Sequence, residues 1–252
     1  MIATEKPCWI EASWPAPDHV RAGTTTRLGG FSQAPYDSLN LAGHVGDKDS
    51  RLADNRQHIS QQLELPSAPL WLKQVHGNHL VDESEWREDI EADACSTRGT
   101  NVVCAVLTAD CLPLLLCNRA GDQVAAIHLG WRGLANDLLD KVVKAFSAKP
   151  ADLLAWIGPH IRQPHYEVGK DVYQLFVDLD SGTNHAFQQQ GDTKWLLSLA
   201  GLTETRLRNS GISMIYDCEA CTYADSRHFF SYRRQKLTGR MATLIWIDSA
   251  GN

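Results

Sequence analysis

Three apolar runs stand close together in the middle of the chain, and polar residues that can do chemistry interrupt them. The runs are Val102 to Leu107, Leu112 to Cys117 and Val124 to Leu129. Each has the length of a buried strand and falls far short of the roughly 20 apolar residues that span a bilayer. The pattern therefore predicts a buried β-sheet and no membrane segment.

The composition of the 252-residue chain is that of a globular protein. It is 43% apolar and 21% charged, which excludes a disordered or low-complexity chain. The length suits one hydrophobic core, so we expect a single domain over residues 1–252. A net charge of −6 is the opposite of a surface that binds nucleic acid or anionic membranes, so neither is an expected partner. Nothing demands a second chain, and we expect a monomer.

The cysteines and the N-terminal residues indicate the compartment. Seven cysteines, an odd number dispersed along the chain, favour a reducing cytoplasm over a disulfide framework. Glu5 and Pro7 stand where a signal peptide needs an unbroken apolar stretch. We therefore expect a cytoplasmic protein in which any specialised cysteine is a ligand or a nucleophile.

Hydrophobic spacing predicts an α+β fold with a mixed sheet, because strands outnumber helices and the two do not alternate regularly. Helices are expected at residues 49–64, 134–148, 168–179 and 194–209. Besides the three central runs, strands are expected at 153–157, 212–216 and 243–247. Residues 118–122 are expected to form a hairpin turn, and 180–192 a surface loop.

Candidate ligands stand at the ends of these apolar runs. Asp110 and Cys111 separate two of the runs, His128 ends the third, and His76 ends a further apolar segment. Two imidazoles and a thiolate suit zinc with one coordination position left for water. Two other interpretations stay open: Cys111 as a nucleophile with His128 as its base, or a set of purely structural residues.

Two rival metal patterns are weaker. Cys218-Glu-Ala-Cys221 and His165-Tyr-Glu167 resemble the signature of zinc nucleobase deaminases. No Pro precedes Cys218, and His165 is expected in a loop, so we interpret the pair as fortuitous. The chain has no His-x-His pair and only three methionines, too few clustered ligands for a multicopper centre.

Two segments could hold an anion. Thr24 to Ser32 places Arg27 beside two glycines, whose backbone amides can approach a phosphate closely. Phe229 to Arg240 gathers four cations, Arg233 among them, beside aromatic residues that could stack on a base. Solvated surface charge is the alternative interpretation of both segments.

The order of several motifs resembles that of the YfiH-type, laccase-domain family, whose members are called polyphenol oxidases and purine nucleoside phosphorylases. The resemblance extends from about Gly23 to Ile247. It rests on Thr25-Thr-Arg27, Ser38-Leu-Asn40-Leu, Lys73-Gln-Val-His76-Gly, Thr108-Ala-Asp-Cys111-Leu-Pro, Ala126-Ile-His128-Leu-Gly-Trp-Arg-Gly, Ile157-Gly-Pro, Tyr166-Glu-Val-Gly, Ser231-Tyr-Arg-Arg and Thr238-Gly-Arg-Met.

This resemblance implies a fold of mixed β-sheets sandwiched by helices, related to cysteine-dependent toxin deamidases. It implies zinc on His76, Cys111 and His128, with purine nucleosides and phosphate as partners. The implied activities are phosphorolysis of adenosine, inosine and methylthioadenosine, and hydrolytic deamination of adenosine. The alternatives are a laccase-like polyphenol oxidase, which would use copper, and a Cys/His hydrolase that edits peptidoglycan precursors.

Roles for individual residues follow from combining the resemblance with their chemistry. The expected catalytic residues are Cys111, His128 and Asp110, with Asp110 transferring a proton. The expected substrate-binding residues are Arg27, Asn40, Arg132 and Arg233, of which Arg27, Asn40 and Arg233 would hold phosphate. A structural role, tying a strand end to nearby carboxylates, is the alternative for Arg132.

Overall fold

The central apolar runs form strands that are buried on both faces. The computed structural model describes residues 8–249 and contains β5 (Cys104–Thr108), β6 (Leu112–Asn118) and β7 (Val124–Leu129). Every residue of these strands is buried, which is why they are continuous apolar runs rather than alternating ones. β6 and β7 pair antiparallel through the predicted hairpin turn.

Two of these strands lie in a six-stranded mixed sheet with the order β12-β8-β6-β7-β4-β3. Its other members are β8 (Leu153–Ile157), β12 (Met214–Asp217), β4 (Ala94–Thr97) and β3 (Leu80–Asp82). The outer pairs β12–β8 and β3–β4 are parallel, whereas the central strands are antiparallel to their neighbours.

The third run, β5, belongs to a separate four-stranded antiparallel sheet with the order β1-β2-β13-β5. The remaining strands are β1 (Trp9–Glu11), β2 (Val20–Thr25) and β13 (Met241–Ile247). A buried apolar layer that includes Val106 and Ile245 from this sheet and Leu115 and Trp156 from the other joins the two faces. The chain therefore crosses from one sheet to the other between β5 and β6.

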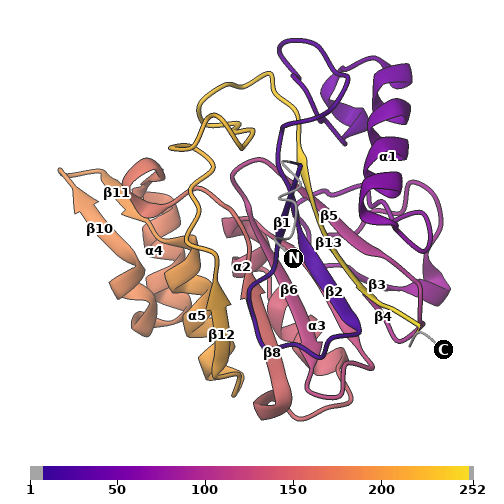
Figure 1. Cartoon of the computed structure of the whole chain (residues 1–252). Helices are drawn as coiled ribbons and strands as arrows, with labels where there is room; N and C mark the ends of the chain where they lie inside the picture. The colour runs from indigo at the N-terminus through magenta and orange to yellow at the C-terminus, as the bar shows by residue number, and fades with distance from the viewer. Residues whose placement is uncertain (1–7, 250–252) are drawn as a thin grey trace.

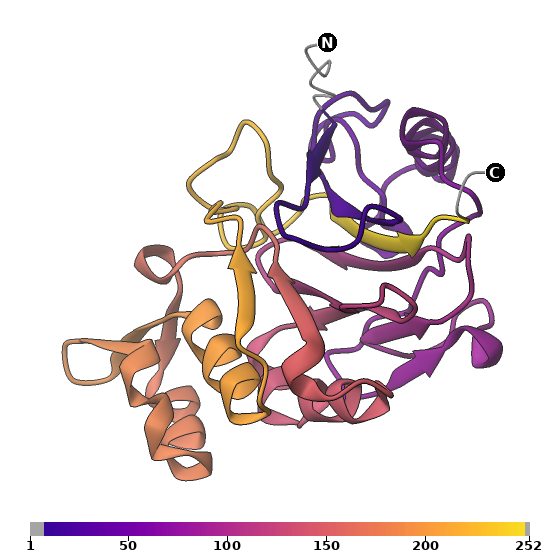
Figure 2. The ribbon, with the colours of Figure 1, turned by 60° about the horizontal axis from the view of Figure 1, so that its bottom comes forward.

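Helices cover the outer face of each sheet. α2 (Trp131–Ala135), α3 (Leu138–Ala145), α4 (Lys170–Leu179) and α5 (Leu199–Asn209) share one buried cluster with the six-stranded sheet. α1 (Asp49–Leu63) packs Ile59 against the four-stranded sheet. Figures 1 and 2 show this helix, sheet, sheet, helix order. The predicted α+β fold with mixed sheets sandwiched by helices is confirmed.

Short elements complete the described part of the chain. A three-stranded antiparallel sheet contains β10 (Phe187–Gln190), β11 (Lys194–Leu197) and β9 (Glu167–Gly169). The 3-10 helices are η1 (Gly43–Val45), η2 (Glu83–Glu85), η3 (Pro150–Asp152), η4 (Gln163–His165) and η5 (Ser181–Ala186). No helix within residues 8–249 combines the length and apolar character needed to cross a bilayer.

Several predicted boundaries are wrong, and each error has a physical cause. The helix expected at 134–148 is interrupted where Asp137 adopts a left-handed conformation (φ +57°), which separates α2 from α3. Residues 180–192 are not a plain loop, because they contain η5 and β10. The helices expected at 168–179 and 194–209 begin later, because their first residues pair with each other as β9 and β11.

The layer between the two sheets yields a test of the core. Leu115→Ala is expected to lower the free energy of unfolding by about 2–5 kcal/mol, because it empties a fully buried site. The matched control is Leu179→Ala on α4, which is 51% exposed and should change the free energy by less than about 0.5 kcal/mol. Urea denaturation followed by tryptophan fluorescence measures both, and equal effects would contradict this packing.

Candidate metal centre

His76, Cys111 and His128 converge from separate parts of the fold. Their donor atoms all lie within 4.8 Å of one another, and Sγ of Cys111 is 3.8 Å from Nε2 of His76. The two imidazole rings meet edge to face, with centroids 4.7 Å apart. Within residues 8–249 this is the one group of three or more His, Cys, Asp or Glu residues whose donor atoms converge in this way.

The crossing between the sheets places the cysteine. Asp110 takes a left-handed conformation (φ +96°) at the turn from β5, and Cys111 then immediately precedes β6. His128 lies in β7 opposite Pro113, so the hairpin register brings it beside Cys111. A Cβ atom at Gly130 would lie 3.2 Å from Sγ of Cys111 and 3.2 Å from Cδ2 of His76. A side chain at position 130 would therefore crowd Cys111 and His76, and the glycine avoids this contact.

The donor set has the chemistry that zinc prefers, and one of its distances is close to that of a zinc site. Zinc binds imidazole nitrogen at about 2.0–2.1 Å and thiolate at about 2.3 Å, so tetrahedral ligand atoms lie about 3.3–3.6 Å apart. The distance of 3.8 Å between Cys111 and His76 is close to that range. Three protein ligands with one open position are typical of catalytic rather than structural zinc.

A buried carboxylate, Asp93, stands behind two of the three ligands. It accepts hydrogen bonds from Nδ1 of His128 (2.8 Å) and from the backbone amides of Val75 (3.2 Å), His76 (3.0 Å) and Gly77 (2.7 Å). Its side chain is fully buried. No sequence pattern predicts the role of Asp93, because three of its four donors are backbone amides, which leave no pattern of residue types.

The loop that carries His76 has a second attachment. The side-chain amide of Gln74 donates to the carbonyl of Leu107 (2.8 Å) and accepts from the amide of the same residue (2.7 Å). Gln74 thereby occupies the place of a neighbouring strand at the edge of β5. The loop of His76 is fixed to the strand that leads into Cys111.

The charges of the site favour a thiolate. Burial alone would raise the pKa of the Cys111 thiol, but the neighbouring His128 and His76 lower it to about 6. Burial would lower the pKa of His128, whereas Cys111 and Asp93 raise it to about 9. Without a metal ion the two side chains form a thiolate–imidazolium pair at neutral pH.

His76 and Cys111 line a cavity of about 210 Å³, whereas His128, whose donor atom lies within 4.8 Å of theirs, is not among the lining residues. Of the predicted substrate-binding residues, Arg132 and Arg233 line it. The guanidinium of Arg233 lies 5.0 Å from the ring centroid of Tyr166, and that of Arg132 lies 4.5 Å from Trp131. Tyr232 and Lys236, from the segment expected to hold an anion and stack on a base, line the cavity as well. Further lining residues, for which no role was expected, include Trp131, Ile161 and Tyr166.

Asp110 also lines the cavity, and its carboxylate is held by three donors. One oxygen accepts from the hydroxyl of Thr222 (2.7 Å). The other accepts from the hydroxyl of Ser231 (3.0 Å) and from the backbone amide of Arg233 (2.6 Å). Asp110 therefore attaches the segment of Ser231 and Arg233 to the turn that carries Cys111.

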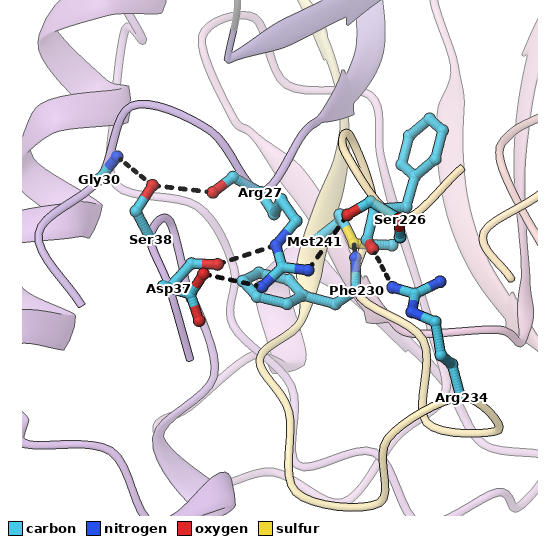
Figure 3. A network of polar contacts seen from close by, with 9 residues as sticks. Arg27, Gly30, Asp37, Ser38, Ser226, Phe230, Arg234 and Met241 are labelled. Atoms are coloured by element: carbon cyan, nitrogen blue, oxygen red, sulfur yellow. Dashed lines mark hydrogen bonds and ion pairs between the residues drawn. The ribbon is translucent and has the colours of Figure 1, made fainter. Parts of the chain in front are cut away.

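Arg27 and Asn40 are not brought to the cavity. Figure 3 shows that the Arg27 guanidinium donates to the carbonyl and carboxylate of Asp37 and to the carbonyl of Ser226. The same group lies 4.7 Å from the ring centroid of Phe230. Asn40 is fully buried, and its amide donates to the carbonyl of Ala42. In this arrangement both residues stabilise the segment around them.

The rival cysteine motif lies outside the centre. Sγ of Cys221 accepts a hydrogen bond from the backbone amide of Arg162, and His165 stacks on Tyr223. Burial raises the pKa of Cys218 to about 11, which disfavours a thiolate ligand. These observations agree with the interpretation of the motif as fortuitous.

The fold and the site together define a class of protein. Proteins of this class have two face-to-face sheets between helices, and a His-Cys-His group where the chain crosses from one sheet to the other. The chain belongs to the family described as multi-copper polyphenol oxidoreductase laccase, whose model matches residues 21–248.

Curated relatives and solved structures agree with this assignment. Proteins named purine nucleoside phosphorylase YfiH from Shigella flexneri and Escherichia coli are 46% and 45% identical over 239 residues. In both comparisons the match covers 94% of this chain and 98% of the relative. The crystal structure of a Neisseria meningitidis protein superposes with a TM-score of 0.92 at 42% identity, covering 96% of this chain and 100% of the other.

The thiolate–imidazolium pair predicts an unusually reactive cysteine in zinc-free protein. Alkylation of Cys111 by iodoacetamide should accelerate as the pH rises through about 6 and then level off, because the thiolate is the nucleophile. Cys218 is the control, and its pKa of about 11 should confine its reaction to alkaline solution. Mass spectrometry of the labelled peptides measures both rates, and a midpoint for Cys111 near the ordinary thiol value of about 8.5 would contradict the pairing.

Proposed function

We propose that this protein is a zinc-dependent purine nucleoside phosphorylase for adenosine, inosine and methylthioadenosine, and that it also deaminates adenosine. The observation that carries the proposal is the convergence of His76, Cys111 and His128 beside a cavity. His76 and Cys111 line that cavity together with Arg132 and Arg233. The names of the relatives support the phosphorylase activity. We further propose that the chain acts as a single domain and a monomer in the cytoplasm.

Zinc is the proposed ion because two imidazoles, one thiolate and an open position suit it. When bound, it would supply Lewis acidity, which makes water a nucleophile near neutral pH. Copper is the alternative suggested by the family description. A multicopper oxidase needs more clustered imidazoles than the single converging group found within residues 8–249.

Cationic side chains of the cavity would bind phosphate. Arg233 and Arg132 each lie against an aromatic ring, which limits their motion and presents their N–H groups. Lys236 adds a third cation to the lining. In an otherwise acidic protein this group favours an anionic substrate beside the ribose. Arg27 and Asn40 remain predicted contributors to phosphate binding. However, they bond to other residues and do not line the cavity, so Arg132, Arg233 and Lys236 are the favoured phosphate ligands.

Aromatic side chains would hold the nucleoside. Tyr166 and Tyr232 line the same cavity as the cations, and a purine has flat faces that stack on such rings. Burial raises the pKa of Tyr166, which keeps its hydroxyl protonated as a hydrogen-bond donor at neutral pH. The tyrosines would exclude water from the reacting carbon while the cations stabilise the developing charge.

Asp110 is the proposed proton carrier of the deamination. Its carboxylate lines the cavity, where it could exchange a proton with the substrate. Asp110 has a second proposed role, because its hydrogen bonds set the position of Arg233.

The proposal predicts both the metal content and the products of the purified protein. It should contain about one zinc per chain, and incubation with adenosine and phosphate should give adenine and ribose-1-phosphate. Without phosphate, adenosine should give inosine. Cys111→Ala should remove the zinc and both activities, whereas Cys218→Ala should leave them unchanged. Elemental analysis and mass spectrometry of the products measure these outcomes.

Two results would favour the alternatives instead. Oxygen uptake with a phenol by protein freed of adventitious copper would support the polyphenol oxidase. Turnover of an amide or a peptidoglycan precursor by zinc-free protein would support the Cys/His hydrolase, which the thiolate–imidazolium pair makes chemically feasible.

The phosphate site yields a further prediction. Arg233→Ala should raise the KM for phosphate about ten- to a hundredfold, because it removes a charged hydrogen-bond donor worth about 1.5–3 kcal/mol. Deamination of adenosine, which needs no phosphate, should fall much less. Arg208→Ala, an exposed arginine near the end of α5, is the matched control. Steady-state kinetics at varied phosphate measures the effect, and an unchanged KM would assign phosphate binding to other residues.

A further inference from the structure

The Asp93 carboxylate hydrogen-bonds both the ring of His128 and the loop that carries His76. One oxygen accepts from Nδ1 of His128 (2.8 Å) and from the backbone amide of His76 (3.0 Å). The other accepts from the amides of Val75 (3.2 Å) and Gly77 (2.7 Å). A single carboxylate thus holds a β-strand residue and a loop residue that are distant in the sequence.

The contact with His128 decides which ring nitrogen can bind an ion. An ionised carboxylate only accepts hydrogen bonds, so Nδ1 of His128 is the donor and carries a proton. The other nitrogen, Nε2, is then the one that can point its lone pair toward Cys111 and His76. A carboxylate behind a histidine ligand also makes the ligating nitrogen more basic.

The contacts with the loop decide where His76 stands. His76 has a φ of +58°, a left-handed conformation that residues with a Cβ atom disfavour. Three consecutive amides that point at one anion form a backbone nest, which compensates for this conformation. Without the carboxylate, nothing in this nest would favour the left-handed residue.

The geometry points to Asp93 as the positioning residue that fixes both histidine ligands, and thereby the affinity and selectivity of the metal centre. The inference rests on the metal site of the proposed function. Asp93 is fully buried and is not part of the cavity lining, so it acts through His76 and His128 rather than on the substrate.

The test compares Asp93→Asn with a nearby carboxylate that contacts no ligand. Asparagine keeps the shape but offers one acceptor oxygen and an NH₂ group that would face donors. Glu91→Gln is the matched control. Glu91 precedes Asp93 by two residues, is exposed and forms an ion pair with Lys73. Competition with a chromophoric chelator measures the zinc affinity of each protein. We expect a loss of about ten- to a hundredfold for Asp93→Asn and less than about twofold for Glu91→Gln.

Cobalt gives a readout that general destabilisation would not move. Co²⁺ bound to the wild-type chain should show the absorption of a tetrahedral site with one thiolate ligand. In Asp93→Asn the bands of the folded protein should shift or weaken, as expected when an imidazole turns away. Circular dichroism and thermal unfolding in the absence of metal report whether the variant is folded.

A measurement on the wild-type protein keeps the inference falsifiable should the variant fail to fold. In ¹⁵N-histidine-labelled protein loaded with zinc, NMR should show His128 protonated at Nδ1 and metal-bound at Nε2. The opposite assignment, with Nδ1 on the ion, would overturn the inference, as would an Asp93→Asn variant with wild-type zinc affinity. A wild-type chain that takes up no zinc would overturn the proposed function as well, which separates the two failures.

Discussion

The buried carboxylate of Asp93 is the interaction on which the site depends. Removing an ionised carboxylate from water is costly unless donors surround it, and here an imidazole and three consecutive amides do so. The same hydrogen bonds that make burial tolerable also fix two side chains that must meet a third. The hydrogen bonds that stabilise the buried charge are therefore the same ones that place the two candidate histidine ligands.

The two-sheet architecture explains why the centre lies where it does. β5 and β6 are consecutive along the chain but belong to different sheets, so the turn at Asp110 and Cys111 is a crossing between layers. The turn at this crossing brings polar side chains, Asp110 and Cys111, to the cavity. The residues of β5 and β6 themselves are buried. At this turn, the carboxylate of Asp110 accepts a hydrogen bond from the backbone amide of Arg233. The candidate metal ligands His76 and Cys111 thus line the same cavity as Arg132 and Arg233.

The layers and the three residues that converge could be predicted from the sequence, but the residues that support them could not. β6, β7 and β8 were predictable because strands buried on both faces leave continuous apolar runs. The break at Asp137 and the pairing of β9 with β11 were not, because each depends on backbone conformation or on a distant partner. Asp93 escaped for a similar reason, since its donors lie 16 to 35 positions away and three of them are main-chain amides.

The electrostatics of the pair also suggest how one set of residues supports both a metal centre and the resemblance to thiol enzymes. Without an ion, Cys111 and His128 share a proton as thiolate and imidazolium, and Asp93 holds the other ring nitrogen of His128. A cation that binds between them needs only to replace this shared proton, since the thiolate is already formed and the ring is already oriented. In the proposed function, metal uptake at this site would release about one proton. A nucleophilic cysteine and a zinc ligand would then be two states of the same Cys111–His128 pair, beside cations and aromatic rings that would bind phosphate and a nucleoside.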